Sequence, residues 1–126
     1  MESIIEINKR HAQEFYDYII NKKDFDAAKR YMGAYKQHNP LLADGPEGIR
    51  ALVEFLKKNF PEARSEVKRV LADGDYVLLH VHSIRQPGTP GRAIMDLFRF
   101  KNGKIEEHWD VIQEIPETAA NQNGMF

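Results

Sequence analysis

The sequence predicts an α+β fold in which three N-terminal helices pack on one face of a curved, mainly antiparallel sheet. Apolar residues repeat at helical spacing up to residue 60, the period changes to two beyond Pro61, and turn dipeptides separate the segments that follow. A chain of 126 residues has room for one ordinary domain, so we expect residues 1–126 to form a single domain. A concave sheet closed by helices tends to enclose a pocket.

Two helices are predicted in the first third of the chain. From 3 to 21, apolar residues recur at the spacing of a helix with one buried stripe. Asp24 can accept amide hydrogens from the first turn of a second helix, which begins at Phe25 and ends near Gly33. Residues 35–40 are predicted to be extended, because Pro40 disfavours the helical conformation for the residue before it.

A third helix is predicted to begin at Asp44-Gly45-Pro46-Glu47. This segment combines a capping residue, a proline near the first helical position and an acid three residues after the cap. The helix stops before Pro61. Its apolar side carries Ile49, Leu52, Val53, Leu56 and Phe60.

Four consecutive strands are predicted beyond Pro61, because these segments are rich in Val, Ile, Leu and aromatic residues. They span 65–71, 76–84, 93–100 and 105–113. Asp73-Gly74 and Asn102-Gly103 are dipeptides typical of tight turns, so the strands that they join should form antiparallel hairpins. A wider loop, residues 86–91, joins the two central strands.

The composition excludes several classes of protein. The 18 Lys and Arg residues nearly balance 19 Asp and Glu, so no global positive charge attracts nucleic acid. The absence of cysteine excludes disulfides, thiol catalysis and thiolate metal sites. No apolar segment approaches the roughly 20 residues of a membrane span, and residues 1–11 carry too many charges for a signal peptide. We therefore expect a cytoplasmic protein with no nucleic-acid or membrane partner.

Polar residues occur on the central strands where a core face is expected. In 76–84, alternation places His80 and His82 on one face. In 93–100, it places Asp96 between Ile94 and Phe98.

In the last strand, alternation groups His108 with Asp110 and puts Trp109 on the other face. Which set faces inward stays open, because a β-bulge would exchange the two.

A carboxylate in an apolar pocket loses hydration, which raises its pKa toward the range useful for proton transfer. Such a group can remove a proton next to a carbonyl, while a neighbouring histidine or second acid donates a hydrogen bond to the enolate oxygen. The residues of the required types are Asp96, Asp110, His38, His80 and His82.

Other interpretations stay open at this point. Asp96 could be a structural acid paired with Arg85 or Arg99. The two histidines of 76–84 could lie on a solvated face of the sheet, or could form a 2-His-1-carboxylate metal site with Asp96. Histidine pairs of this spacing often bind nothing, so we expect no metal.

Several motifs spread over nearly the whole chain resemble those of the SnoaL-like polyketide cyclase family of the NTF2-like superfamily. They are Gln37-His38-Asn39-Pro40, Asp44-Gly45-Pro46-Glu47-Gly48, Asp73-Gly74-Asp75-Tyr76-Val77, His80-Val81-His82, Asp96-Leu97-Phe98-Arg99 and Gly103-Lys104-Ile105-Glu106-Glu107-His108-Trp109-Asp110. The resemblance implies an NTF2-like, cone-shaped α+β barrel, usually homodimeric, whose open end admits a small apolar ligand.

The resemblance also implies an aldol-type ring closure that needs no metal or organic cofactor. By similarity, Asp110 is the first choice for the acid/base residue, and Asp96 is second or its partner. The resemblance and the strand faces together give an expected set of substrate-binding residues, namely His38, Asn39, His80, His82, Phe98, His108 and Trp109. The polar members of this set favour a ligand smaller and more hydrophilic than a fused aromatic polyketide.

Two functions from different classes follow. The first is a cofactor-independent cyclase or isomerase that removes a proton next to a carbonyl of a small molecule. The alternative is a non-catalytic module that holds a small molecule in the same cone. A metal-dependent oxygenase or hydrolase is a third, less favoured hypothesis.

Overall fold

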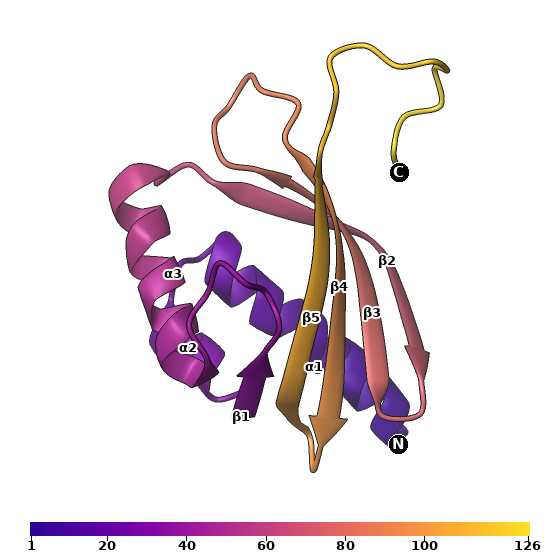
Figure 1. The fold of residues 1–126 in the computed structure, drawn as a ribbon. Coiled ribbons are helices and arrows are strands. Elements are labelled where there is room, and N and C mark those ends of the chain that lie inside the picture. The colour runs from indigo at the N-terminus through magenta and orange to yellow at the C-terminus, as the bar shows by residue number, and fades with distance from the viewer.

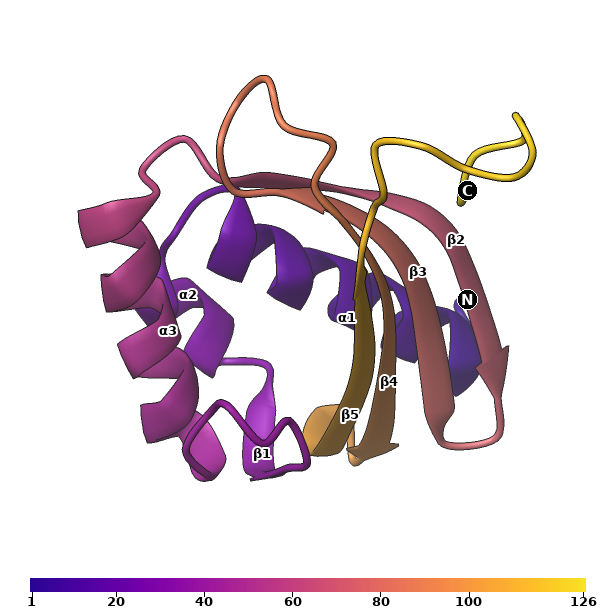
Figure 2. The ribbon, with the colours of Figure 1, turned by 45° about the horizontal axis from the view of Figure 1, so that its top comes forward.

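The computed structural model describes residues 1–126 as three helices and one curved, unclosed five-stranded sheet (Figure 1). The helices cover the concave face of the sheet (Figure 2). The elements in chain order are α1 (Ile4–Ile20), α2 (Phe25–Lys29), β1 (Met32–Gln37), α3 (Gly45–Asn59), β2 (Arg64–Asp73), β3 (Tyr76–Ile84), β4 (Arg92–Lys101) and β5 (Lys104–Glu114). This arrangement confirms the predicted α+β class.

The first helix forms where its apolar stripe predicted it. Ser3 caps α1 by accepting a hydrogen bond from the amide of Glu6. The buried side of α1 includes Ala12, Phe15, Tyr16 and Ile19. Tyr16 thereby enters the interior among apolar neighbours.

The second helix is shorter than predicted, and a strand follows it. The carboxylate of Asp24 accepts a hydrogen bond from the amide of Ala27, as the cap predicted, but α2 ends at Lys29. The next residues form β1, which pairs in parallel with β5. The sequence therefore predicted four strands where the structure has five. The missing strand, β1, is stabilised by pairing with residues about 70 positions away, and local sequence patterns do not reveal such pairing.

The third helix has its predicted extent but not its predicted cap. Asp44 precedes α3, yet its side chain makes no cap hydrogen bond. Its Oδ1 atom instead accepts from the amide of Gln37 at 2.8 Å. Asp44 therefore fixes the end of β1. Pro46 lies in the first turn of α3, where a residue needs no partner for its amide.

The other four strands form the predicted antiparallel meander, so the strand order is β1-β5-β4-β3-β2. Asn102 and Gly103 both have positive φ angles, as a tight hairpin turn requires. Beyond this turn the register shifts: Phe100 pairs with Ile105, and Arg99 pairs with Glu107. This bulge changes the side-chain alternation, so both Ile105 and His108 lie inside.

The hydrophobic core lies between the concave face and the helices. Its large, fully buried side chains include Phe15, Tyr35, Val53, Leu56, Val77, Leu79, Phe98 and Phe100. The other face of the sheet is exposed and carries several apolar residues, Leu71, Tyr76, Met95 and Val111. None of the helices is long and apolar enough to cross a membrane.

Candidate active site

A cavity of about 100 Å³ is lined by residues of the concave face of the sheet and of the helices. Most of its lining is hydrophobic, with Phe15, Leu42, Leu52 and Leu56 among the wall residues. Leu41 lines it while remaining 86% exposed, so it lies at the rim. The volume has room for several water molecules and favours a small ligand.

Asp96 is the most deeply buried acid of the cavity. It lies on β4 between the inward-facing Ile94 and Phe98, as the alternation of this strand predicted. Burial raises the pKa of Asp96, the hydrogen bond and charge of His108 lower it in part, and the charge of Asp110 raises it. A raised pKa suits proton exchange at neutral pH.

His108 connects the two acids of the cavity. Its Nε2 atom lies 2.8 Å from Oδ1 of Asp96 and 4.0 Å from Oδ2 of Asp110. The ring is stacked against Tyr35, at 5.6 Å between centroids, and packs on Phe98 at 4.9 Å. The imidazole is therefore held in one orientation, with Nε2 directed at the carboxylates.

Gln37 determines which nitrogen of His108 carries hydrogen. Its Oε1 atom accepts from the amide of Asn39 at 3.0 Å, and since an amide N–H can only donate, this atom is the oxygen. The same Oε1 lies 2.8 Å from Nδ1 of His108, so Nδ1–H is the donor of that contact. The contact with Asp96 then contains one further proton, held either by Nε2 or by the carboxyl group. His108 and Asp96 share this proton.

Asp110 is the acid nearer to the open part of the cavity. It pairs with Asp96 across β4 and β5, and its side chain is 10% exposed against 3% for Asp96. Its Oδ2 atom accepts from Nδ2 of Asn39 at 3.0 Å. The amide of Leu41 donates to Oδ1 of Asn39, which fixes the orientation of this side chain. Asp110 is thus positioned for a ligand that enters past Leu41.

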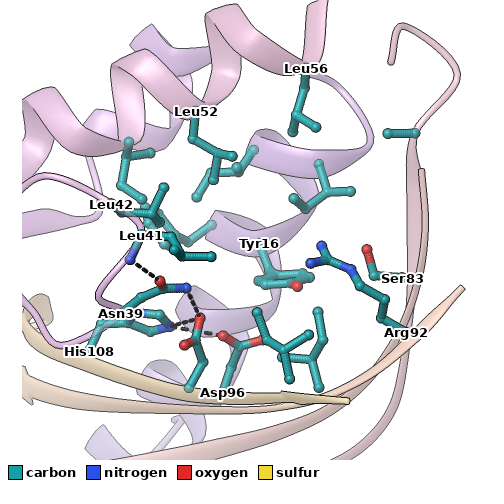
Figure 3. Close-up of a pocket in the computed structure, with 18 of the residues that line it drawn as sticks. Tyr16, Asn39, Leu41, Leu42, Leu52, Leu56, Ser83, Arg92, Asp96 and His108 are labelled. Atoms are coloured by element: carbon teal, nitrogen blue, oxygen red, sulfur yellow. Dashed lines mark hydrogen bonds and ion pairs between the residues drawn. The ribbon is translucent and has the colours of Figure 1, made fainter. Parts of the chain in front are cut away.

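The opposite end of the cavity carries hydroxyl and guanidinium groups. Figure 3 shows Arg92 and Ser83 on one side of Tyr16, and Asp96 and His108 toward the other. Burial raises the pKa of Tyr16 well above its ordinary value, and the charge of Asp96 raises it further. Tyr16 is therefore a hydrogen-bond donor at neutral pH.

The site residues predicted from the sequence do not include Tyr16, Gln37 or Arg92. Arg92 could have been predicted from the sequence. It lies four positions before Asp96 on β4, and strand alternation places even-numbered residues of this strand on one face. Gln37 belongs to a motif that was identified, but its role depends on the parallel pairing of β1 with β5.

The structure places His80 and His82 on the outer face of the sheet, away from this cavity. Val77, Leu79 and Val81 occupy the buried face of β3, so the residues between them point outward. His80 contacts Arg69, and His82 contacts the carbonyl of Pro90. The C-terminal residue, Phe126, lies against both rings. The expected contact of these histidines with a ligand does not form in this cavity.

His38 and Trp109 also lie outside the cavity. Their rings are stacked, with centroids 4.9 Å apart and planes within 2° of parallel. Nε2 of His38 lies 2.6 Å from Oε2 of Glu107, and this hydrogen bond, together with Arg99, lowers the pKa of Glu107. Among the predicted site residues, the structure brings together at the cavity Asn39, Asp96, Phe98, His108 and Asp110.

One group of side chains at the cavity has the donor types of a metal site. One ligand atom from each of Asp96, His108 and Asp110 lies within 4.8 Å of the others. An imidazole with two carboxylates is a donor set used for divalent transition metals. A metal there would need Nε2 of His108 as a ligand and would displace the proton shared with Asp96. The 2-His-1-carboxylate set does not form, since His80 and His82 are on the other face.

The protein has an NTF2-like fold, with an acid–imidazole group between the sheet and the helices. The model of the family described as SnoaL-like polyketide cyclase matches residues 10–120, and the chain belongs to this family. No protein of the curated collection matches significantly.

Solved structures show the same fold at low sequence identity. TsrD from Streptomyces laurentii is 17% identical, with a TM-score of 0.72, over 88% of this chain and 91% of that one. A candidate polyketide cyclase from Bacillus cereus is 20% identical, with a TM-score of 0.73, over 84% and 74%. An NTF2-like protein of unknown function from Cytophaga hutchinsonii is 19% identical, with a TM-score of 0.69, over 84% and 89%.

Proposed function

We propose that this chain removes a proton from the carbon next to a carbonyl group of a small molecule, without a cofactor, and that an aldol-type ring closure or an isomerisation follows. One observation carries the proposal: His108 lies between two carboxyl groups and shares a proton with one of them. The site therefore has both a base and an acid within reach of one ligand. Membership of the SnoaL-like family supports this reaction class.

Asp110 is the base in this proposal, because it is the more accessible acid and Asn39 fixes its position. Its carboxylate takes the proton from the α carbon, and the electron pair of the broken C–H bond forms the C=C bond of an enolate. The proton shared by Asp96 and His108 forms a hydrogen bond to the enolate oxygen. General acid–base catalysis of this kind contributes about 10²- to 10⁴-fold in rate.

The second half of the reaction returns the proton from Asp110. In a ring closure, the enolate carbon attacks a second carbonyl carbon of the same molecule, and the resulting alkoxide takes the proton. In an isomerisation, the proton returns to a different carbon. Either route balances without an oxidant, a reductant or a metal.

Exchange of α-protons in D₂O tests this proposal, with butanone as a small uncharged substrate and ¹H NMR as the readout. We expect acceleration over buffer, and a loss of about 100-fold or more in Asp110→Asn and in Asp96→Asn. Asp73→Asn is the matched control, because Asp73 is exposed at the end of β2. If both cavity variants exchange as fast as the unaltered protein, this mechanism is wrong. If butanone binds without exchange, the chain is a binding module.

We also propose that two copies of the chain pair through the outer face of the sheet. This face exposes Leu71, Met95 and Val111, which no helix covers. Sedimentation at micromolar concentration should show a dimer, and Met95→Lys should shift it toward the monomer. A monomer at all concentrations would contradict this proposal.

A further inference from the structure

Two guanidinium groups lie at the end of the cavity opposite Asp96, and neither has an acidic partner. Arg85 and Arg92 both line the cavity, and neither makes an ion pair within 4.0 Å. By contrast, Arg99, on the outer face of the same sheet, pairs with Glu107 at 3.1 Å. A partly buried cation without a counter-charge is costly, so its presence needs an explanation.

Arg92 is partly buried in the wall of the cavity. It shares the inward face of β4 with Ile94 and Asp96, and its Nε atom is buried with no hydrogen-bond partner. Its register partner on β3 is Ser83, which is buried. Figure 3 shows the guanidinium directed toward Tyr16, across the cavity. The Nε donor of Arg92 thus lies beside Ser83 with no protein acceptor, whereas the hydroxyl of Tyr16 lies within hydrogen-bonding reach of Asp96.

Arg85 reinforces the positive charge at this end. Its guanidinium lies over the rings of Phe55 and Phe60, at 5.5 and 5.6 Å from their centroids. Burial and the charge of Arg92 lower the pKa of Arg85, whereas Glu114 raises it. Glu114 is exposed and, although it is the register partner of Arg92 on β5, it forms an ion pair with neither arginine. An anion bound between the two arginines would remove their mutual repulsion.

We propose that this end of the cavity is a carboxylate subsite, and that the ligand is a small oxo acid. The guanidinium of Arg92 can donate two parallel hydrogen bonds to a carboxylate, and Ser83 supplies a further donor. The carboxylate of Asp110 repels a second carboxylate from the other end. The ligand therefore binds in one orientation, with its carboxylate at Arg92 and its ketone toward His108. The placement of the ketone rests on the proposed function.

Two probes of equal shape and different charge test the subsite. 4-Oxopentanoate and 4-oxopentanamide differ in the replacement of a carboxylate by a neutral amide. Titration followed by ¹H–¹⁵N NMR should give 4-oxopentanoate the higher affinity by about tenfold or more. Arg92→Gln should remove this preference, and Arg92→Lys should retain part of it. Arg99→Gln, which loses a guanidinium from the outer face of the same strand, should retain it fully.

The outcomes separate this inference from the proposed function. Equal affinities for the two probes, an unchanged preference in Arg92→Gln, or tighter binding of inorganic phosphate than of 4-oxopentanoate would overturn the subsite. No binding of 4-oxopentanoate at 100 mM would overturn it as well. Retention of the preference in Asp110→Asn would support the subsite. If the unaltered protein shows the preference but does not accelerate α-proton exchange, the subsite stands and the proposed chemistry alone is rejected.

Discussion

The Oε1 atom of Gln37 lies 2.8 Å from Nδ1 of His108, although 71 positions separate the two residues in the chain. The contact forms because β1 runs parallel to β5 with these residues in register. It leaves Nε2 as the nitrogen that faces the carboxylates. A residue outside the list of expected site residues thus decides the protonation pattern of the site.

Replacing Gln37 should impair catalysis without removing any group that touches the ligand. In Gln37→Leu, Nδ1 of His108 loses its acceptor, so both tautomers of the ring become accessible. We expect α-proton exchange to fall by about 10- to 100-fold, and the imidazole ¹⁵N shifts of His108 to report the mixed tautomers. Gln113→Leu, at the exposed end of β5, is the control. Unchanged exchange and unchanged shifts would show that Gln37 does not hold the ring.

The raised pKa of Asp96 predicts a pH dependence of stability. Between the ordinary value of 3.8 and the raised value, the folded state binds more protons than the unfolded state. The contribution of Asp96 to the free energy of unfolding is therefore largest below this window and falls as the pH rises through it. Urea denaturation in pH steps should show this fall in the unaltered protein and not in Asp96→Asn. A constant difference between the two proteins would contradict the raised pKa.

The two faces of the sheet should differ sharply in their sensitivity to truncation. Leu79 on β3 is 0% exposed, so Leu79→Ala should lower the free energy of unfolding by about 2–5 kcal/mol. Leu71 on β2 is 56% exposed, and Leu71→Ala should change it by less than about 1 kcal/mol. Chemical denaturation measures both. Similar losses in the two variants would mean that the inward and outward faces are assigned incorrectly.

The position of the two strand histidines predicts that they do not take part in the chemistry. The double variant His80→Gln, His82→Gln should keep the α-proton exchange rate, since both rings lie across the sheet from the cavity. The same NMR assay measures this rate. A severe loss of exchange in a folded double variant would restore the role expected from the sequence.

Removal of metal ions should leave the reaction intact, because the proposed steps move only protons. Protein dialysed against EDTA and checked by elemental analysis should exchange α-protons at the original rate. Added Zn²⁺ should slow the reaction, since it would bind Nε2 of His108 in place of the shared proton. Loss of the rate on dialysis, with recovery on adding a divalent cation, would favour a metal-dependent function.

Local sequence patterns correctly predicted those helices, caps and turns that are stabilised by residues close together in the chain. The stripe of α1, the cap at Asp24 and the turn at Asn102-Gly103 all occur as expected. The same holds for the inward face of β4, because Asp96 is surrounded by apolar residues at alternate positions. By contrast, His80 and His82 were predicted as site residues because histidine suits catalysis. The opposite face of β3 is the more apolar one, and it is the face that packs into the core.

The sequence by itself thus determined the α+β class, the family resemblance and the inward position of Asp96, since periodicity and turn chemistry act over a few residues. Only the tertiary structure decided that Gln37 meets His108, that a bulge turns His108 and Asp110 inward, and that Arg92 lines the same cavity. These relationships depend on strand register and sheet curvature. Both are set by contacts between distant segments, and no window of neighbouring residues contains them.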